Sequence, residues 1–127
     1  MNYETQRNKV IRRHINGIIH LNHIIHDGQS NYRHRERVNQ ICNLLMEKEY
    51  DFLTRPEVIV WNGRHFSQPE SLYPDVITWI PEPFKTVIIE VTDSEKKDHA
   101  ESKNYPSGFK VISHSVEDSL EDLSCLI

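Results

Sequence analysis

The segment that most constrains the fold is a strongly apolar run, Lys85-Thr86-Val87-Ile88-Ile89-Glu90-Val91. Its β-branched residues favour a strand, and an apolar run without alternation is typical of a strand that is covered on both faces. Pro81-Glu82-Pro83 precedes the run and predicts a turn. Because such a strand requires protein on both sides of its sheet, we expect a layered domain.

The rest of the chain alternates between helical and extended patterns. Helices are predicted over 5–26, 32–48, 93–104 and 115–126, the last capped by Ser115, and further strands over 52–61, 75–80 and 109–113. Pro56 indicates that the strand over 52–61 is an edge strand or begins after the proline. The length of 127 residues suits about one ordinary domain. We therefore predict a single α/β domain with an additional N-terminal helix.

Charge divides the chain into two parts. Residues 1–37 carry seven Lys/Arg and three Asp/Glu (net +4), whereas residues 38–127 carry eight and sixteen (net −8). A basic, His-rich helical extension over 1–31 would hold phosphates, and an acidic body over 32–127 would hold divalent cations. The alternative is that the basic residues only form a solvated helix face.

The sequence also suggests where the protein resides. No stretch approaches the ~18 apolar residues of a membrane span, and the N-terminus lacks the apolar core of a signal peptide. Cys42 and Cys125 have no metal-ligand spacing, so free thiols in a reducing compartment are expected. We therefore expect an intracellular, cytoplasmic protein that has no membrane partner.

Two carboxylates are candidates for a metal site. Asp75 opens one predicted strand, and Glu90 lies near the end of the next, with Thr92 on the same face as Glu90. Two carboxylates and the Val91 carbonyl are the oxygen ligands that Mg²⁺ or Mn²⁺ prefers, and the metal would activate water and neutralise charge on a phosphodiester. The alternative is a carboxylate that simply leaves the sheet into solvent.

These residues resemble a known superfamily of nucleases. Tyr73-Pro74-Asp75-Val76-Ile77, followed by Val87-Ile88-Ile89-Glu90-Val91-Thr92, resembles the PD-(D/E)XK motif. That superfamily includes Holliday-junction resolvases, restriction endonucleases and nucleases of viruses and transposons. The resemblance implies an αβββαβ core over about 32–115, in a three-layer α/β/α fold with a mixed sheet of about four strands. It also implies that Asp75, Glu90 and the Val91 carbonyl hold Mg²⁺ or Mn²⁺.

The chain departs from the motif at Thr92, where the superfamily usually has a lysine. Some members place this lysine on the next helix, so Lys103 is the candidate replacement, ahead of Lys97 and Lys96. Some branches add a residue from the first helix. Helical phase at ~100° per residue turns Glu36 away from the apolar face and brings His34 onto it. His34 is therefore the candidate extra site residue, and a packed or capping histidine is the plainer alternative.

The remaining polar clusters suggest how DNA would be bound. The candidate DNA-binding residues lie on the two N-terminal helices and are Arg7, Lys9, Arg12, Arg13, Arg33 and Arg35. In a helix, His20, His23 and His26 would not share one narrow face, so a zinc site is the weaker interpretation of that cluster. Trp61 and Trp79 are expected in the core.

The sequence thus predicts a Mg²⁺-dependent DNA endonuclease that acts as a homodimer. The alternative is an inactive module of the same fold that binds DNA or a protein.

Overall fold

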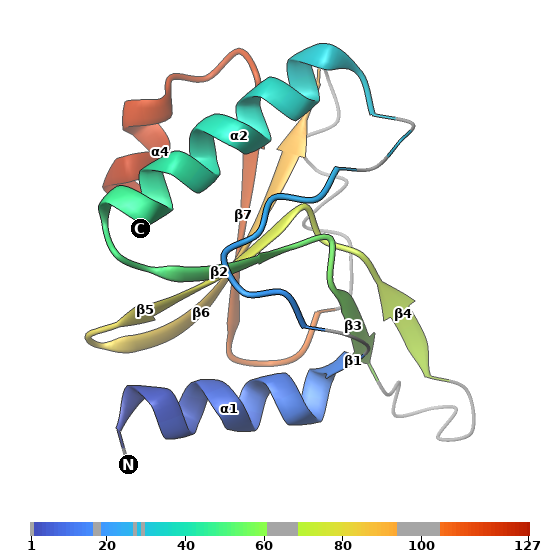
Figure 1. Cartoon of the computed structure of the whole chain (residues 1–127), viewed down its shortest axis with the longest axis vertical. Helices are drawn as coiled ribbons and strands as arrows, with labels where there is room; N and C mark the ends of the chain where they lie inside the picture. Colours follow the sequence, from blue (N-terminus) through green and yellow to red (C-terminus); the bar gives the residue numbers. More distant parts are fainter. Residues whose placement is uncertain (1, 17–18, 27, 29, 61–68, 94–104) are drawn as a thin grey trace.

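The fold is a mixed α/β arrangement with two sheets (Figure 1). A computed structural model describes residues 2–16, 19–26, 28, 30–60, 69–93 and 105–127. Its helices are α1 (Tyr3–His14), α2 (Tyr32–Glu47) and α4 (Leu120–Leu126). Its strands are β1 (Ile15–Asn16), β2 (Asp51–Thr54), β3 (Glu57–Val60), β4 (Glu70–Leu72), β5 (Val76–Pro81), β6 (Phe84–Thr92) and β7 (Phe109–Ser115).

The larger sheet has four strands in the order β2-β5-β6-β7. β5 is antiparallel to both β2 and β6, whereas β7 is parallel to β6. The apolar run in β6 is therefore an inner strand, as its composition predicts, and it is buried from Thr86 to Val91. The smaller sheet has the order β1-β3-β4. The predicted mixed four-stranded sheet and N-terminal helix are confirmed.

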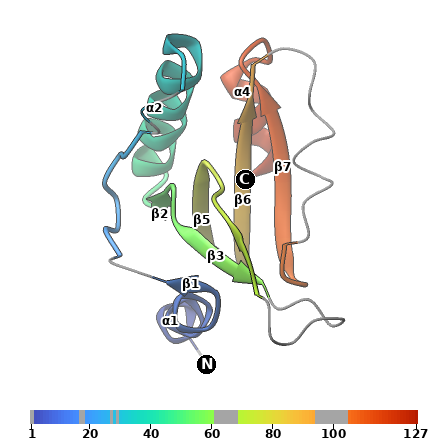
Figure 2. The ribbon, with the colours of Figure 1, turned by 90° about the vertical axis from the view of Figure 1, so that its right-hand side faces the viewer.

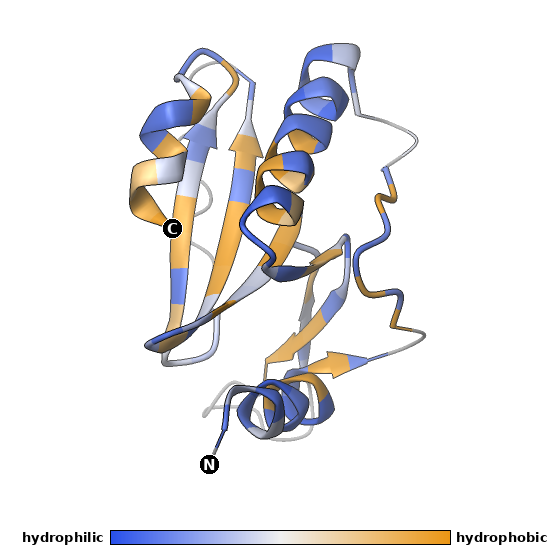
Figure 3. Ribbon diagram, turned by 60° about the vertical axis from the view of Figure 1, so that its left-hand side comes forward, coloured by the Kyte–Doolittle hydropathy of each residue, from blue (hydrophilic) through white to orange (hydrophobic). Residues whose placement is uncertain are grey.

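Apolar side chains cover both faces of the larger sheet. On one face, α2 and α4 pack their buried residues, including Ile41 and Leu123, against β5, β6 and β7. On the other face, Trp79 and Ile88 pack with residues of the small sheet and α1. The strands are mainly apolar along their lengths (Figure 3). Trp79 is fully buried, which confirms its predicted place in the core. The three-layer arrangement stays a prediction, because the helix expected over 93–104 lies almost entirely outside the described residues.

The helix predicted over 5–26 is wrong beyond His14. Ile15 instead enters the core and pairs with Val58, which ends the helix. Further along, Asn22 adopts a left-handed backbone (φ 63°) and exchanges hydrogen bonds with Phe52 at the edge of β2. The free edge of β2 is thereby covered, as edge strands generally require.

Two other predicted elements differ from the structure. The strand predicted over 52–61 is divided between β2 and β3, in different sheets, because Arg55 is left-handed (φ 50°) and Pro56 follows it. The C-terminal helix is capped by Ser119 rather than Ser115, because Ser115 belongs to β7. β4 was not predicted, since its residues lie in a polar segment. Trp61 lies outside the described residues.

The two cysteines are free thiols in different environments. Cys42 on α2 is buried, and burial raises the pKa of its thiol to about 12, whereas Cys125 on α4 is exposed. At pH 8 only about one Cys42 thiol in ten thousand would be ionised, and the thiolate is the reactive form. We expect a disulfide reagent to titrate one thiol rapidly and the second only after unfolding. Cys125→Ser should remove the rapid phase, and rapid reaction of both thiols in the native protein would contradict the assignment.

Candidate active site

The site is built where β5 begins and β6 ends. The pairing of Val76 with Ile89 places Asp75 directly opposite Glu90 along the two antiparallel strands. Opposed residues of an antiparallel pair project from the same face. Both residues are buried, with only 7% of Asp75 and 8% of Glu90 exposed. The structure therefore brings together the two carboxylates that the sequence analysis selected.

Three groups surround the Asp75 carboxylate. Its Oδ2 accepts a hydrogen bond from the Val91 main-chain N–H at 2.8 Å. Its Oδ1 lies 3.1 Å from Nε2 of His34 and 3.9 Å from Nη1 of Arg55. A buried carboxylate is costly unless donors or positive charges offset its desolvation. Asp75 is thus contacted by Val91 of β6, by His34 of α2 and by Arg55 of the segment between β2 and β3.

His34 reaches this site from the first turn of α2. Asn31 caps the helix by accepting the His34 main-chain N–H at 2.9 Å. The expected orientation is confirmed, since His34 turns toward Asp75 whereas Glu36 is exposed. The catalytic role of His34 stays a prediction.

Arg55 is a site residue that the sequence analysis missed. Its main-chain N–H donates to the Asp75 carbonyl at 3.1 Å, and its Nη1 donates to the Tyr73 carbonyl at 2.8 Å. Its left-handed backbone costs of order 1–3 kcal/mol for a residue with a side chain, and the position before a proline normally favours extended backbone. In the sequence, the one sign of this site residue is that Arg55-Pro56 interrupts an apolar run. Arg55 brings a fixed positive charge beside Asp75.

Glu90 is paired with another residue that the sequence analysis missed. The Tyr105 hydroxyl donates to Glu90 Oε1 at 2.7 Å. The pKa of Tyr105 is raised, first by burial, then by its hydrogen bond to Glu90 and by the charges of Glu90 and Asp75, whereas Arg55 acts in the opposite direction. The four side chains therefore share one electrostatic environment. A phenol is protonated at neutral pH, and the raised pKa keeps the Tyr105 hydroxyl a hydrogen-bond donor to more alkaline pH as well.

Hydroxyl groups continue the polar face beyond Glu90. Thr92 lies two residues further along β6, and Ser113 is the partner of Glu90 on β7. The hydroxyl oxygens of both residues are buried and make no hydrogen bond with any described residue. Buried hydroxyls normally have a partner, which for these two would come from outside the described residues. Lys103, Lys97 and Lys96 lie outside the described residues.

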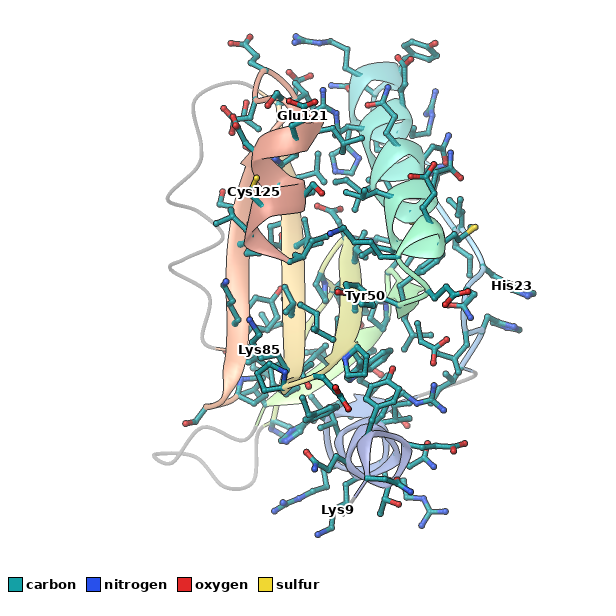
Figure 4. The ribbon with its side chains drawn as sticks, turned by 90° about the vertical axis from the view of Figure 1, so that its left-hand side faces the viewer. Lys9, His23, Tyr50, Lys85, Glu121 and Cys125 are labelled. Carbon is teal, nitrogen blue, oxygen red and sulfur yellow. The ribbon has the colours of Figure 1, made fainter. Side chains whose placement is uncertain are left out.

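The candidate DNA-binding residues fall into two groups at opposite ends of the molecule. Lys9, Arg12 and Arg13 are exposed on α1, which packs against the start of β6 through Tyr3 and Phe84. Figures 1 and 2 show α1 at the opposite end of the strands from the N-terminal end of α2, and Figure 4 shows Lys9 pointing away from the body. The basic face of α1 is therefore separated from the two carboxylates by most of the length of β6.

The other three arginines are engaged within the protein. Arg7 pairs with Asp51 at the start of β2. Arg33 is exposed near the site and lies 3.2 Å from Asp93, just after β6, while Arg35 donates to the Ser30 carbonyl at 2.6 Å. Of the predicted DNA-binding residues on α2, Arg33 has the more accessible guanidinium.

The His-rich segment does not form one cluster. The rings of His20 and His23 stack with centroids 5.9 Å apart, whereas Nε2 of His26 contacts Oδ1 of Asn39 at 3.0 Å. Figure 4 shows His23 directed outward. Within the described part of the chain, no three His, Cys, Asp or Glu side chains are grouped to hold a metal ion. From the described residues, a metal between Asp75 and Glu90 would therefore receive carbonyl or water ligands in addition to these two side chains.

Comparisons with protein-family models, with curated proteins and with solved structures found no match. Among the described helices, none is long and apolar enough to cross a membrane.

Proposed function

We propose that the protein is a Mg²⁺- or Mn²⁺-dependent nuclease of the PD-(D/E)XK type that hydrolyses phosphodiester bonds in DNA. The observation that carries this proposal is the pair of buried carboxylates, Asp75 and Glu90, at facing positions of β5 and β6. Two buried negative charges on one face of a sheet are costly, and a divalent cation would offset that cost. We propose an endonuclease that cuts both strands as a homodimer.

The donors present suit the proposed metal. Asp75, Glu90 and the Val91 carbonyl would hold it, and all three offer the oxygen atoms that Mg²⁺ prefers over nitrogen or sulfur. The hydroxyls of Thr92 and Ser113, which have no hydrogen-bond partner among the described residues, extend the same polar face and suit its hydration shell. When bound, the metal would supply Lewis-acid stabilisation of the phosphate and activation of a water.

Neighbouring residues would position this machinery. His34 and the Val91 N–H fix the Asp75 carboxylate from two sides, and Tyr105 fixes Glu90. Such supporting contacts orient ligands before substrate arrives. Arg55 would provide the positive charge that Thr92 cannot, and a guanidinium can stabilise negative charge on a phosphate.

The strand order also supports the proposal. Within the described residues, α2, β2, β5, β6 and β7 follow the αβββ…β order of the proposed core, and the β3–β4 pair is inserted between β2 and β5. β2, β6 and β7 run in one direction and β5 in the other. A three-layer α/β/α core with a helix between β6 and β7 is the corresponding proposal for the complete domain.

A second candidate function is an inactive module of the same fold that binds DNA or a protein partner. It is favoured by the partners that the carboxylates already have, since His34 and Arg55 lie beside Asp75 and Tyr105 donates to Glu90. A carboxylate pair compensated by the protein itself can remain stable without a cation.

Purified protein with Mg²⁺ or Mn²⁺ should cut plasmid, linear or branched DNA, and EDTA should stop the reaction. Asp75→Ala and Glu90→Ala should lose the activity, because each removes a proposed metal ligand. Equal cleavage by the wild type and both variants would identify a contaminating nuclease and contradict the proposal.

Calorimetry with Mn²⁺ separates the two candidate functions. Binding in the micromolar to millimolar range that is lost in Asp75→Ala supports the nuclease. If no heat of Mn²⁺ binding is detected, and if Asp75→Ala binds DNA as tightly as the wild type, the results support the inactive binding module. Sedimentation equilibrium of the same samples tests the proposed homodimer.

A further inference from the structure

A pocket opens directly beside the proposed active site. It has a volume of about 290 Å³ and lies between β2, β3 and the chain that follows β1. Ile15 and Leu53 form its buried floor, and Asn16, Glu57 and Arg55 provide polar groups. This volume is just below the usual range for ligand pockets, roughly 300–1,000 Å³. The pocket therefore suits a partly apolar group of modest size.

Exposed apolar side chains gather at this pocket. Of the six large apolar side chains that are exposed in the described part of the chain, three line it: Ile19, Ile25 and Tyr73. The Arg55 guanidinium lies 5.9 Å from the centre of the Tyr73 ring. Exposed apolar groups concentrated in one place indicate a binding surface rather than ordinary surface composition. Aromatic rings are the side chains on which nucleic-acid bases stack, and a neighbouring arginine can add a cation–π contribution.

The polar groups of the pocket match the edge of a base. Glu57 accepts hydrogen bonds from Ser71 Oγ at 2.8 Å and from Asn16 Nδ2 and Tyr73 Oη at 3.3 Å each. These contacts hold the carboxylate in place, and they lower its pKa, so Glu57 stays an ionised acceptor at neutral pH and further into the acidic range. A carboxylate can accept from the amino group of a base.

The pocket adjoins the residues that surround Asp75. Arg55 and Ile25 line both this pocket and a shallow hollow that also includes His34 and Asp75. A nucleotide with its base in the pocket could therefore place its phosphate toward Arg55 and the next phosphate toward Asp75 and Glu90.

We infer that this pocket receives one unpaired nucleobase of the strand that is cut, stacked against Tyr73, so that the substrate is DNA with an unpaired nucleotide at the cleavage position. This inference rests on the proposed function for the cleavage itself. A base within an intact duplex is held in its stack and cannot enter such a pocket without being extruded. Single strands, flaps and branched DNA should therefore be preferred over blunt duplex.

The test is DNA binding in EDTA, where the proposed chemistry cannot occur. The probe is a fluorescein-labelled single strand of roughly 12 nucleotides, which extends beyond the pocket even at the ~3.4 Å rise of a stacked B-form strand, and the comparison is a blunt duplex of the same sequence. Anisotropy should show about tenfold tighter binding of the single strand by the wild-type chain. Tyr73→Ala should remove most of this preference, whereas Tyr73→Phe, which keeps the ring, should change it by less than about twofold.

A second variant covers the case in which Tyr73→Ala perturbs folding. Ile25→Trp should fill the pocket and weaken single-strand binding by about fivefold or more, while leaving duplex binding unchanged. Met46→Trp is its matched control, because Met46 is equally exposed (45% against 46%) and does not line this pocket. Met46→Trp should bind like the wild type.

The outcomes separate this inference from the proposed function. One possible result is that the protein prefers single strands, that Ile25→Trp abolishes this preference, and that no cleavage occurs with Mg²⁺ or Mn²⁺. This result would support the proposed base-binding pocket and contradict the proposed nuclease activity. The opposite result is metal-dependent cleavage by a protein that does not prefer single strands, or that binds single strands equally as Ile25→Trp and as Met46→Trp. This result would contradict the proposed base-binding pocket and would still support the proposed nuclease activity.

Discussion

Glu90→Gln is expected to abolish Mn²⁺ binding and to reduce DNA cleavage by more than about 100-fold. The substitution keeps the shape of the side chain and an oxygen that can accept from Tyr105, but it removes one of the two negative charges that would bind the cation. Loss of a direct ligand should exceed the ~10–100-fold effects that are typical of groups supporting a ligand. Calorimetry and a cleavage assay measure the two quantities.

Stability measurements distinguish this loss of function from unfolding. Glu90 is buried opposite Asp75, so neutralising it should leave the metal-free protein as stable as the wild type or more stable. Glu70→Gln, at an exposed position on β4, provides the control for removal of a carboxylate and should retain full activity. Wild-type Mn²⁺ affinity in Glu90→Gln would remove this residue from the proposed site.

Tyr105→Phe should have a smaller effect in the same assays. It removes only the hydroxyl that orients Glu90, so metal affinity should fall by ~10–100-fold at most. This variant reports whether positioning of the ligand matters separately from its charge.

Arg55→Ala is expected to reduce the cleavage rate by ~10²–10³-fold while Mn²⁺ binding persists. That magnitude is typical when one preorganised group that stabilises transition-state charge is removed. Metal binding should persist because the variant removes a positive charge near the proposed site and leaves Asp75 and Glu90 in place. Arg55→Lys should recover part of the rate, since it restores the charge without the planar guanidinium.

The backbone of Arg55 supplies a matched pair of variants. Arg55→Gly and Arg55→Ala both lack the guanidinium, but only glycine adopts φ 50° without strain. Arg55→Gly should therefore be more stable to denaturant than Arg55→Ala by ~1 kcal/mol, and both should show the same loss of cleavage. Cleavage at the wild-type rate by either variant would exclude Arg55 from the chemistry and leave the region over 94–104 as the remaining place for a catalytic lysine.

Local patterns were sufficient to predict the central strands and the two carboxylates. β6 follows from its apolar composition, and the turn at Pro81-Glu82-Pro83 returns the chain so that Asp75 faces Glu90. The orientation of His34 follows from helical periodicity alone. These features depend on neighbours within one helix or one pair of strands, where sequence periodicity carries direct information.

The features that were missed depend on contacts between distant segments. Ile15 leaves the helical pattern because it pairs with Val58, and Tyr105 meets Glu90 only after the chain has returned from the end of β6. Arg55 enters the site through a left-handed residue in the middle of an apolar run, which the strand pattern alone would not suggest. Tertiary pairing overrides local propensity at each of these positions.

The placement of α1 has a consequence for the length of DNA that the protein can cover. Phe84, which contacts α1, and Glu90 are six residues apart along β6, or about 20 Å at ~3.3 Å per residue. At the ~3.4 Å rise per nucleotide of B-form DNA, a strand that reached from the basic face of α1 to Glu90 would have a footprint of about six nucleotides, and an extended single strand would need fewer. Oligonucleotides shorter than this could occupy only one end of the molecule, and their affinity should depend less steeply on salt.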